Sequence, residues 1–215
     1  MKSKIGAILL TVAMCISVSP YAFATEECKE NDLIPNQVYC VMERTDGTEE
    51  VVLGQLTSFH EFFNNANDPN IAATYAFDVY RDGETLSIKK ANNTKKGTDE
   101  KEISQISLTV YYQIDDSESV AKYLLNQVSG SWKILEDGVS VTNGMVRYGC
   151  SDGSTVQDDE KNVDNYFVVK TGFDKYIEDA PMSVMGATLF LDYELADGSN
   201  FRIQFTNNYI NNGIT

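Results

Sequence analysis

Five Asp-Gly dipeptides divide the chain into short segments and constrain its fold more than any other feature. They are Asp46-Gly47, Asp82-Gly83, Asp137-Gly138, Asp152-Gly153 and Asp197-Gly198. Asp-Gly is a strong hairpin signal because both central residues of a tight type I′ turn need a positive φ. The dipeptides therefore predict antiparallel hairpins rather than parallel strands connected by helices.

The segments beside the dipeptides differ in kind. Alternating apolar residues lie on both sides of Asp82-Gly83, Asp137-Gly138 and Asp197-Gly198, which we predict to be hairpin turns. Asp46-Gly47 is predicted to be a turn between two strands as well. Asp152-Gly153 opens an acidic loop, and no return strand is evident after it.

Alternation of polar and apolar residues continues along most of the chain. Its longest run contains Ile106, Leu108, Val110, Tyr112 and Ile114, with polar residues or Tyr111 between them. Such alternation is typical of a strand with one buried face and one solvated face. We therefore predict a mainly β protein, an antiparallel β-sandwich or partly closed barrel built from hairpins, with one or two short helices.

Two segments have helical features. Ser58 and Glu61 have the spacing of a capping box, and phenylalanines around them form a short apolar face, so a helix of two or three turns is expected there. Residues 116–128 are ambiguous, because Val120, Leu124 and Val128 fit helical spacing.

Residues 1–24 are predicted to be a signal peptide. Lys2 and Lys4 precede an apolar stretch that is short for a bilayer span, and Ala22-Phe23-Ala24 has the small-x-small pattern of a cleavage site. An uncleaved membrane anchor is the alternative. No later stretch approaches the length of a transmembrane helix, so we expect the mature chain to be soluble and secreted or extracellular, with the cell envelope as a further location.

Composition divides the mature chain into three parts. Residues 25–90 are expected to be an N-terminal β-rich region with the short helix, residues 91–102 a charged loop or linker, and residues 103–215 a C-terminal β-sandwich-like region. One continuous domain over residues 25–215 is the alternative. Asn143-Gly144 predicts a further turn within the C-terminal region.

The charge balance excludes some partners. Cleavage would remove two of the 17 basic residues and none of the 32 acidic ones, which leaves a net charge of −17. Nucleic acids and anionic membranes need a positive binding surface, so neither is an expected partner. An unidentified protein or glycan is expected instead.

Cysteine and histidine are too few for most catalytic or metal-binding arrangements. Cys28, Cys40 and Cys150 allow one disulfide and one leftover thiol in an oxidising compartment, with three pairings open, or three reduced thiols. His60 is the one histidine, and no nucleophile motif surrounds it. A zinc site is not expected.

Carboxylates are the remaining side chains that could bind a metal ion or take part in catalysis. Asp152, Asp158, Asp159, Glu160 and Asp164 crowd one predicted loop, residues 152–164, and suit a hard cation such as calcium, although their spacing is not that of an EF-hand. No other cofactor is expected. A pair of acidic residues that hydrolyses glycosides is an alternative. With 32 acidic residues, the sequence does not indicate which two would form the pair.

The segment from about Val128 to Tyr209 contains short motifs spread over less than half of the chain. They are Ser129-Gly130-Ser131-Trp132, Val139 to Asn143, Val146 to Gly149, and Phe167 with Thr171-Gly172-Phe173. In these motifs the segment resembles uncharacterised secreted proteins of Gram-positive bacteria. The resemblance implies export and a β-rich fold.

These observations together predict a secreted, soluble, non-catalytic binding or surface-interaction protein. The alternatives are a secreted hydrolase that uses paired carboxylates and a calcium-stabilised structural protein of the cell envelope.

Overall fold

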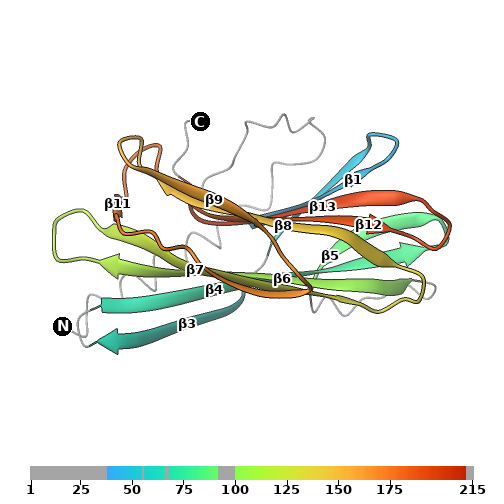
Figure 1. Ribbon diagram of the computed structural model, residues 1–215, viewed down its shortest axis with the longest axis horizontal. Helices are drawn as coiled ribbons and strands as arrows, with labels where there is room; N and C mark the ends of the chain where they lie inside the picture. The colour runs from blue at the N-terminus through green and yellow to red at the C-terminus, as the bar shows by residue number, and fades with distance from the viewer. Residues whose placement is uncertain (1–37, 55, 66–67, 92–99, 212–215) are drawn as a thin grey trace.

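The computed structural model describes residues 38–54, 56–65, 68–91 and 100–211. Two antiparallel sheets pack face to face as a sandwich that is not closed into a barrel (Figure 1). Every described residue in regular structure lies in a strand, so the one or two helices predicted from the sequence are absent from this part of the chain. No helix within it is therefore long and apolar enough to cross a bilayer.

The first sheet, sheet A, joins the two ends of the described chain. Its order is β2-β1-β13-β12-β8-β9, so β1 near the N-terminus pairs with β13 near the C-terminus. The strands are β1 (Val38–Arg44), β2 (Glu49–Leu53), β8 (Ser140–Ser151), β9 (Val156–Asn162), β12 (Val184–Glu194) and β13 (Asn200–Asn211).

The second sheet, sheet B, has the order β10-β7-β6-β4-β3. Strand β5 pairs with β4 beyond the end of β3, and the short β11 pairs with β7 beside β10. The strands are β3 (Leu56–Asn65), β4 (Asp68–Asp82), β5 (Thr85–Lys90), β6 (Lys101–Asp115), β7 (Lys122–Ile134), β10 (Tyr166–Lys170) and β11 (Ile177–Glu178).

One hydrophobic core fills the space between the sheets, and both predicted β-rich regions contribute to it. Cys40 and Met42 of β1 are fully buried together with Leu108 of β6 and Leu189 of β12. Phe77 of β4 meets Phe205 of β13 edge to face, with ring centroids 4.9 Å apart. Asn207 of β13 adds a polar tie, because its Nδ2 donates to the carbonyls of Ala73 and Leu108 in sheet B.

All five Asp-Gly dipeptides form turns with a positive φ at glycine, and four of them connect hairpin strands. The aspartates have negative φ, so the turns are not the predicted type I′. At Asp46-Gly47 the Gly47 N–H donates to Arg44 O and the Arg44 N–H to Thr48 O, a type I turn followed by a glycine bulge. Asp137-Gly138 is not a hairpin turn, because it connects β7 of sheet B to β8 of sheet A.

Three further predictions about local structure were wrong. The segment with the capping-box spacing, Ser58 to Glu61, lies in strand β3, and most of the ambiguous 116–128 segment lies in β7. Asn143-Gly144 lies inside β8 rather than in a turn. Gly144 instead makes room for Trp132, since a Cβ on Gly144 would lie 2.6 Å from the indole ring.

The acidic segment after Asp152-Gly153 is a strand, which corrects the expectation of a loop without a return strand. Strand β9 pairs with β8 from Ser151↔Val156 to Met145↔Asn162. Its side chains are largely exposed because β9 is the edge of sheet A. Charged residues on an edge strand discourage pairing with another chain. The predicted linker, residues 91–102, lies mostly outside the described residues.

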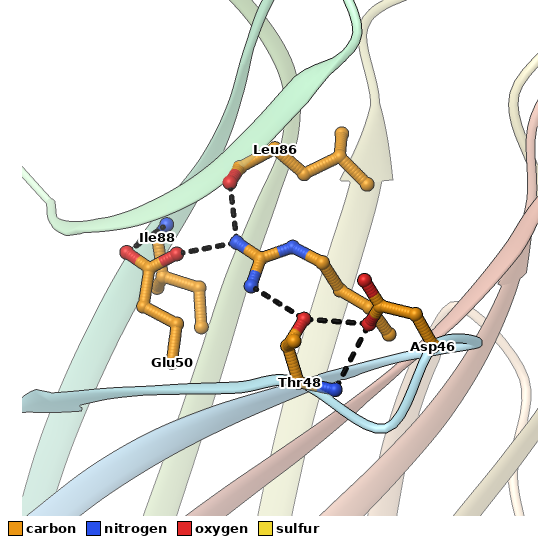
Figure 2. A network of polar contacts seen from close by, with 6 residues as sticks. Asp46, Thr48, Glu50, Leu86 and Ile88 are labelled. Atoms are coloured by element: carbon orange, nitrogen blue, oxygen red, sulfur yellow. Dashed lines mark hydrogen bonds and ion pairs between the residues drawn. The ribbon is translucent and has the colours of Figure 1, made fainter.

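A polar clasp ties β1 and β2 of sheet A to β5 of sheet B (Figure 2). The Arg44 guanidinium donates to the Glu50 carboxylate at 2.9 Å and to Leu86 O at 2.6 Å. Glu50 also accepts the Ile88 N–H at 3.2 Å, and Thr48 connects Arg44 to Asp46. The clasp satisfies backbone groups of β5 and closes this side of the sandwich.

Replacing Glu50 with alanine should lower the free energy of unfolding by about 1–2 kcal/mol, because it leaves Arg44 and the Ile88 N–H without this acceptor. Chemical denaturation monitored by circular dichroism measures the change. Glu49→Ala is the matched control, since Glu49 is the preceding residue on the solvent side of β2; its effect should stay within about 0.5 kcal/mol. Equal effects of the two variants would contradict a role for the clasp.

Candidate functional site

The β6–β7 connection, the β8–β9 turn and β11 come together at one end of the sandwich (Figure 1). An acidic depression of about 470 Å³ lies between their side chains. Its walls include Asp115, Lys122, Asp152, Tyr176 and Glu178. The fold thus brings residues from two acidic segments of the sequence, around Asp115 and around Asp152, to the same place.

Hydrogen bonds within the protein already occupy both oxygens of Asp152. Its Oδ1 accepts the N–H groups of Ser154 and Thr155 and the Ser154 hydroxyl, at 2.7–2.9 Å. Its Oδ2 accepts the Glu178 N–H at 3.3 Å. The Thr155 N–H, assisted by Ser154, lowers the pKa of Asp152 to about 2. Asp152 therefore closes its turn and holds β11 in place.

The pH dependence of stability tests this role. The folded pKa of Asp152 lies below its ordinary value, so its contribution is present above about pH 4 and is lost as the pH falls toward 2. Asp152→Asn should lower the melting temperature at neutral pH, and the difference from the wild type should disappear near pH 2. Asp158→Asn, on the exposed β9, is the control. A difference that persists at pH 2 would show that the carboxylate charge is not the cause.

The other residues of the predicted calcium site are distributed differently from the expectation. Asp158, Asp159 and Glu160 are consecutive on β9, so their side chains point to alternate faces, and Asp164 lies in the connection to β10. Asp159 accepts the Tyr148 hydroxyl at 2.8 Å, and Glu160 pairs with Arg147 at 3.0 Å. Within the described ranges no three acidic, histidine or cysteine side chains converge on a common metal position.

The described cysteines do not form a disulfide. Cys40 on β1 and Cys150 on β8 are free and buried, with β13 and β12 between their strands. Three strand spacings alone place their backbones at least about 14 Å apart, which is too far for a disulfide. Burial raises the pKa of the Cys40 thiol, so Cys40 is an inert core residue. Cys28 lies outside the described residues.

An apolar row on the outer face of sheet A is the main feature that the sequence analysis missed. Strand register places Val51, Val41, Gln204, Phe190 and Met145 side by side across five strands. Leu53 and Tyr39 are the first two residues of the neighbouring register row. We define the apolar row as Tyr39, Val41, Val51, Leu53, Met145 and Phe190.

These side chains point away from the core. Val51 is 43% and Leu53 38% exposed, while the other four are half-buried. Single exposed apolar residues are ordinary. Here the four residues of β1 and β2 adjoin one another, and Phe190 adjoins Met145, with Gln204 of β13 between the two groups. Such a grouping of apolar residues on a surface is typical of an interaction site.

Charged residues flank the apolar row on both sides. On one side Glu49 lies opposite Glu43, and Arg202 forms a two-point ion pair with Asp192 at 2.7 and 3.2 Å. A shallow depression of about 430 Å³ lies there, lined by Glu43, Asp192 and Arg202 among others. On the other side Arg147 pairs with Glu160.

Two like charges directly opposite each other on adjacent strands are unfavourable unless something neutralises them. Glu43 and Glu49 are such a pair, with Arg202 beside Glu43 in the register. The row is therefore mainly apolar, with Gln204 at its middle, and its rim has a net negative charge, because four acidic residues face two arginines there. A polar rim around apolar residues is the arrangement of a protein-binding surface.

Comparison with known proteins identifies no relative: no family model, curated protein or solved structure matches this chain. The class of protein is therefore defined by its fold and surfaces, an antiparallel β-sandwich with an exposed apolar row on one sheet.

Proposed function

We propose that this protein is an exported, non-catalytic interaction module that binds a protein partner through the outer face of sheet A. The apolar row carries the proposal, because six apolar side chains from four strands lie on one solvent-facing side of sheet A, with Gln204 of β13 between them. The predicted signal peptide supports export of the chain.

The partner is expected to present apolar side chains flanked by lysine or arginine. The chain has a net charge of −15, and Glu43 and Glu49 lie beside the apolar row. Opposite charge on the partner would speed association and fix its orientation, while burial of the apolar row would supply most of the affinity. Two copies of this acidic chain would repel each other, which favours a different partner over self-association.

Asp115 and Asp152 of the acidic depression are unsuited to the role of general acid in a hydrolase. A general acid in a glycosidase needs a pKa raised toward neutrality. The pKa of Asp152 is lowered to about 2, and the Ser117 hydroxyl and N–H lower the pKa of Asp115. Both shifts oppose the role of a general acid. Turnover of any glycan or peptide by the purified protein would favour the hydrolase instead.

Aspartate substitutions in the apolar row test the proposal. Proteins captured from the extracellular fraction of the host are purified, and their affinity for the wild type and for Val51→Asp and Phe190→Asp is measured by calorimetry. Each substitution should lower the affinity for a true partner at least about tenfold, because the new carboxylate in the centre of the interface would be desolvated and unpaired.

Val156→Asp is the matched control for this experiment. Val156 is 67% exposed on β9, the opposite edge strand of sheet A, and lies outside the apolar row. It should bind like the wild type. Equal affinity of all variants for every captured protein would refute the proposal. If the wild type forms a dimer and Val51→Asp does not, the apolar row binds a second copy of this chain instead of another protein. A rise in melting temperature in millimolar calcium would favour the calcium-stabilised alternative.

A further inference from the structure

The outer face of sheet B carries a regular array of uncharged side chains. Strand register places Ala76, Ser107, Ser131 and Tyr166 in one row across β4, β6, β7 and β10. The next row contains Thr74, Thr109, Ser129 and Val168, and Tyr111 follows beside Thr109 on β6. We define these nine residues as the hydroxyl face.

Hydrogen bonds across the strands hold these hydroxyls in fixed positions. Ser107 and Ser131 are bonded at 2.9 Å, Thr74 and Thr109 at 2.9 Å, and Ser129 donates to the Tyr111 hydroxyl at 3.2 Å. A hydroxyl that takes part in one such bond still has a lone pair or proton for a ligand. Thr109 is itself buried, at 8% exposure, and the other five hydrogen-bonded residues are half-buried. Those five hydroxyls give the face preorganised donors and acceptors at the strand spacing of about 4.8 Å.

The absence of charge from these two rows contrasts with the rest of the chain. Acidic and basic residues together make up 23% of the sequence, yet none of the nine residues of the hydroxyl face is acidic or basic. The nearest charges in the register, Asp78, Lys133 and Lys170, lie at the borders of the hydroxyl face. Such a face does not attract ions or strongly charged partners, and it matches a ligand without formal charge.

Strand β10 adds an exposed aromatic and apolar border. Tyr166 is 71% and Val168 49% exposed. The alternate residues of the strand, Phe167 and Val169, are buried in the core, so Tyr166 and Val168 point outward. An exposed tyrosine beside fixed hydroxyls can cover the apolar face of a ring while the hydroxyls bond its polar edge. The two rows of the hydroxyl face extend across four adjacent strands, and such an extended surface suits a polymer rather than a small molecule.

We infer that the hydroxyl face binds a neutral polysaccharide. This inference is independent of the proposed function, because the hydroxyl face and the apolar row lie on the outer sides of different sheets. A protein with both sites would connect a glycan surface to a protein partner.

Retention on insoluble neutral polysaccharides tests the inference. The purified mature protein is incubated with cellulose, chitin and β-1,3-glucan, and the bound fraction is measured at low and at high salt. At least one polysaccharide should retain the protein equally at low and at high salt, since a neutral ligand makes no ion pairs that salt could screen. No retention, or retention that high salt removes, would overturn the inference.

Variants then locate the site. Tyr166→Ala should lower the affinity for the polysaccharide about tenfold because it removes the aromatic contact. Ser129→Asp should lower it by a similar factor because it places a charge in the centre of the hydroxyl face. Val168→Ala is a milder second variant in case Ser129→Asp alters folding, which melting curves report. Val51→Asp on sheet A should bind like the wild type. Retention that Tyr166→Ala and Val168→Ala leave unchanged would also overturn the inference.

Discussion

Replacing Phe205 with alanine is expected to lower the free energy of unfolding by about 3–5 kcal/mol. Phe205 is fully buried on β13, between Cys40 of β1 and Leu189 of β12 in the register. Its ring meets Phe77 of sheet B edge to face. The substitution therefore leaves a cavity between the sheets and removes an aromatic contact that joins them.

Chemical denaturation of Phe190→Ala provides the matched control for Phe205. Phe190 lies on the neighbouring strand β12 but faces outward, where Arg147 approaches its ring at 6.0 Å. Its loss should cost about 1 kcal/mol, the value of an exposed cation–π contact and partial burial. A difference of less than about 2 kcal/mol between the two variants would contradict the assignment of Phe205 to the inter-sheet core.

Replacing Gly186 with alanine is expected to destabilise the fold by about 3 kcal/mol or more, at the upper end for an overpacked site. The register between β12 and β13 shifts at Met185/Gly186, which brings Asn207 and Asn208 over Gly186. An alanine Cβ would lie 2.6 Å from the Asn208 Cα and closer still to the Asn207 carbonyl oxygen. Backbone atoms cannot move aside as a flexible side chain can.

A double variant separates backbone from side-chain crowding at this bulge. Asn208→Gly removes the Asn208 side chain but leaves the backbone of Asn207 and Asn208 in place. Gly186→Ala/Asn208→Gly should therefore be no more stable than Gly186→Ala by thermal denaturation. Recovery of wild-type stability would show that only the Asn208 side chain obstructs the position.

Sequence reasoning succeeded where a structural signal is local. The Asp-Gly dipeptides located four turns correctly, since a positive φ is a property of the glycine itself, and the fifth, Asp152-Gly153, is a turn where a loop was expected. Alternation identified the strands whose inner faces are buried, such as β6. The edge strand β9 escaped detection because an edge strand with both faces exposed has no apolar alternation.

Both segments where the expectation of helices failed are strands with an irregular register. In β7 the register passes from Tyr111↔Gln127 to Tyr112↔Leu125, so Asn126 is an extra residue. The insertion moves the inward positions from Tyr123 and Leu125 to Val128. Of the three residues with helical spacing only Val128 is buried, because Val120 is 40% exposed before β7 and Leu124 lies on the outer side between Tyr123 and Leu125. The register of β3 shifts twice, and pairing with β4 overrides the capping-box signal at Ser58.

The candidate surfaces were harder to anticipate than the strands. Clustering of acids in the sequence suggested calcium, but a strand directs consecutive side chains to opposite faces and so separates Asp158, Asp159 and Glu160. The apolar row and the hydroxyl face consist of residues from strands far apart in the sequence. Only the register brings them together.

The sequence by itself determined the positions of most turns, the mainly β character and the inward residues of the strands with apolar alternation, because each depends on a few neighbouring residues. Only the tertiary structure decided which strands pair, that Asp137-Gly138 crosses between sheets, and that Val51 and Phe190 belong to one surface. These features depend on contacts between residues as far apart as Val38 and Asn207. The packing energy of the whole core selects such contacts, and no local pattern records them.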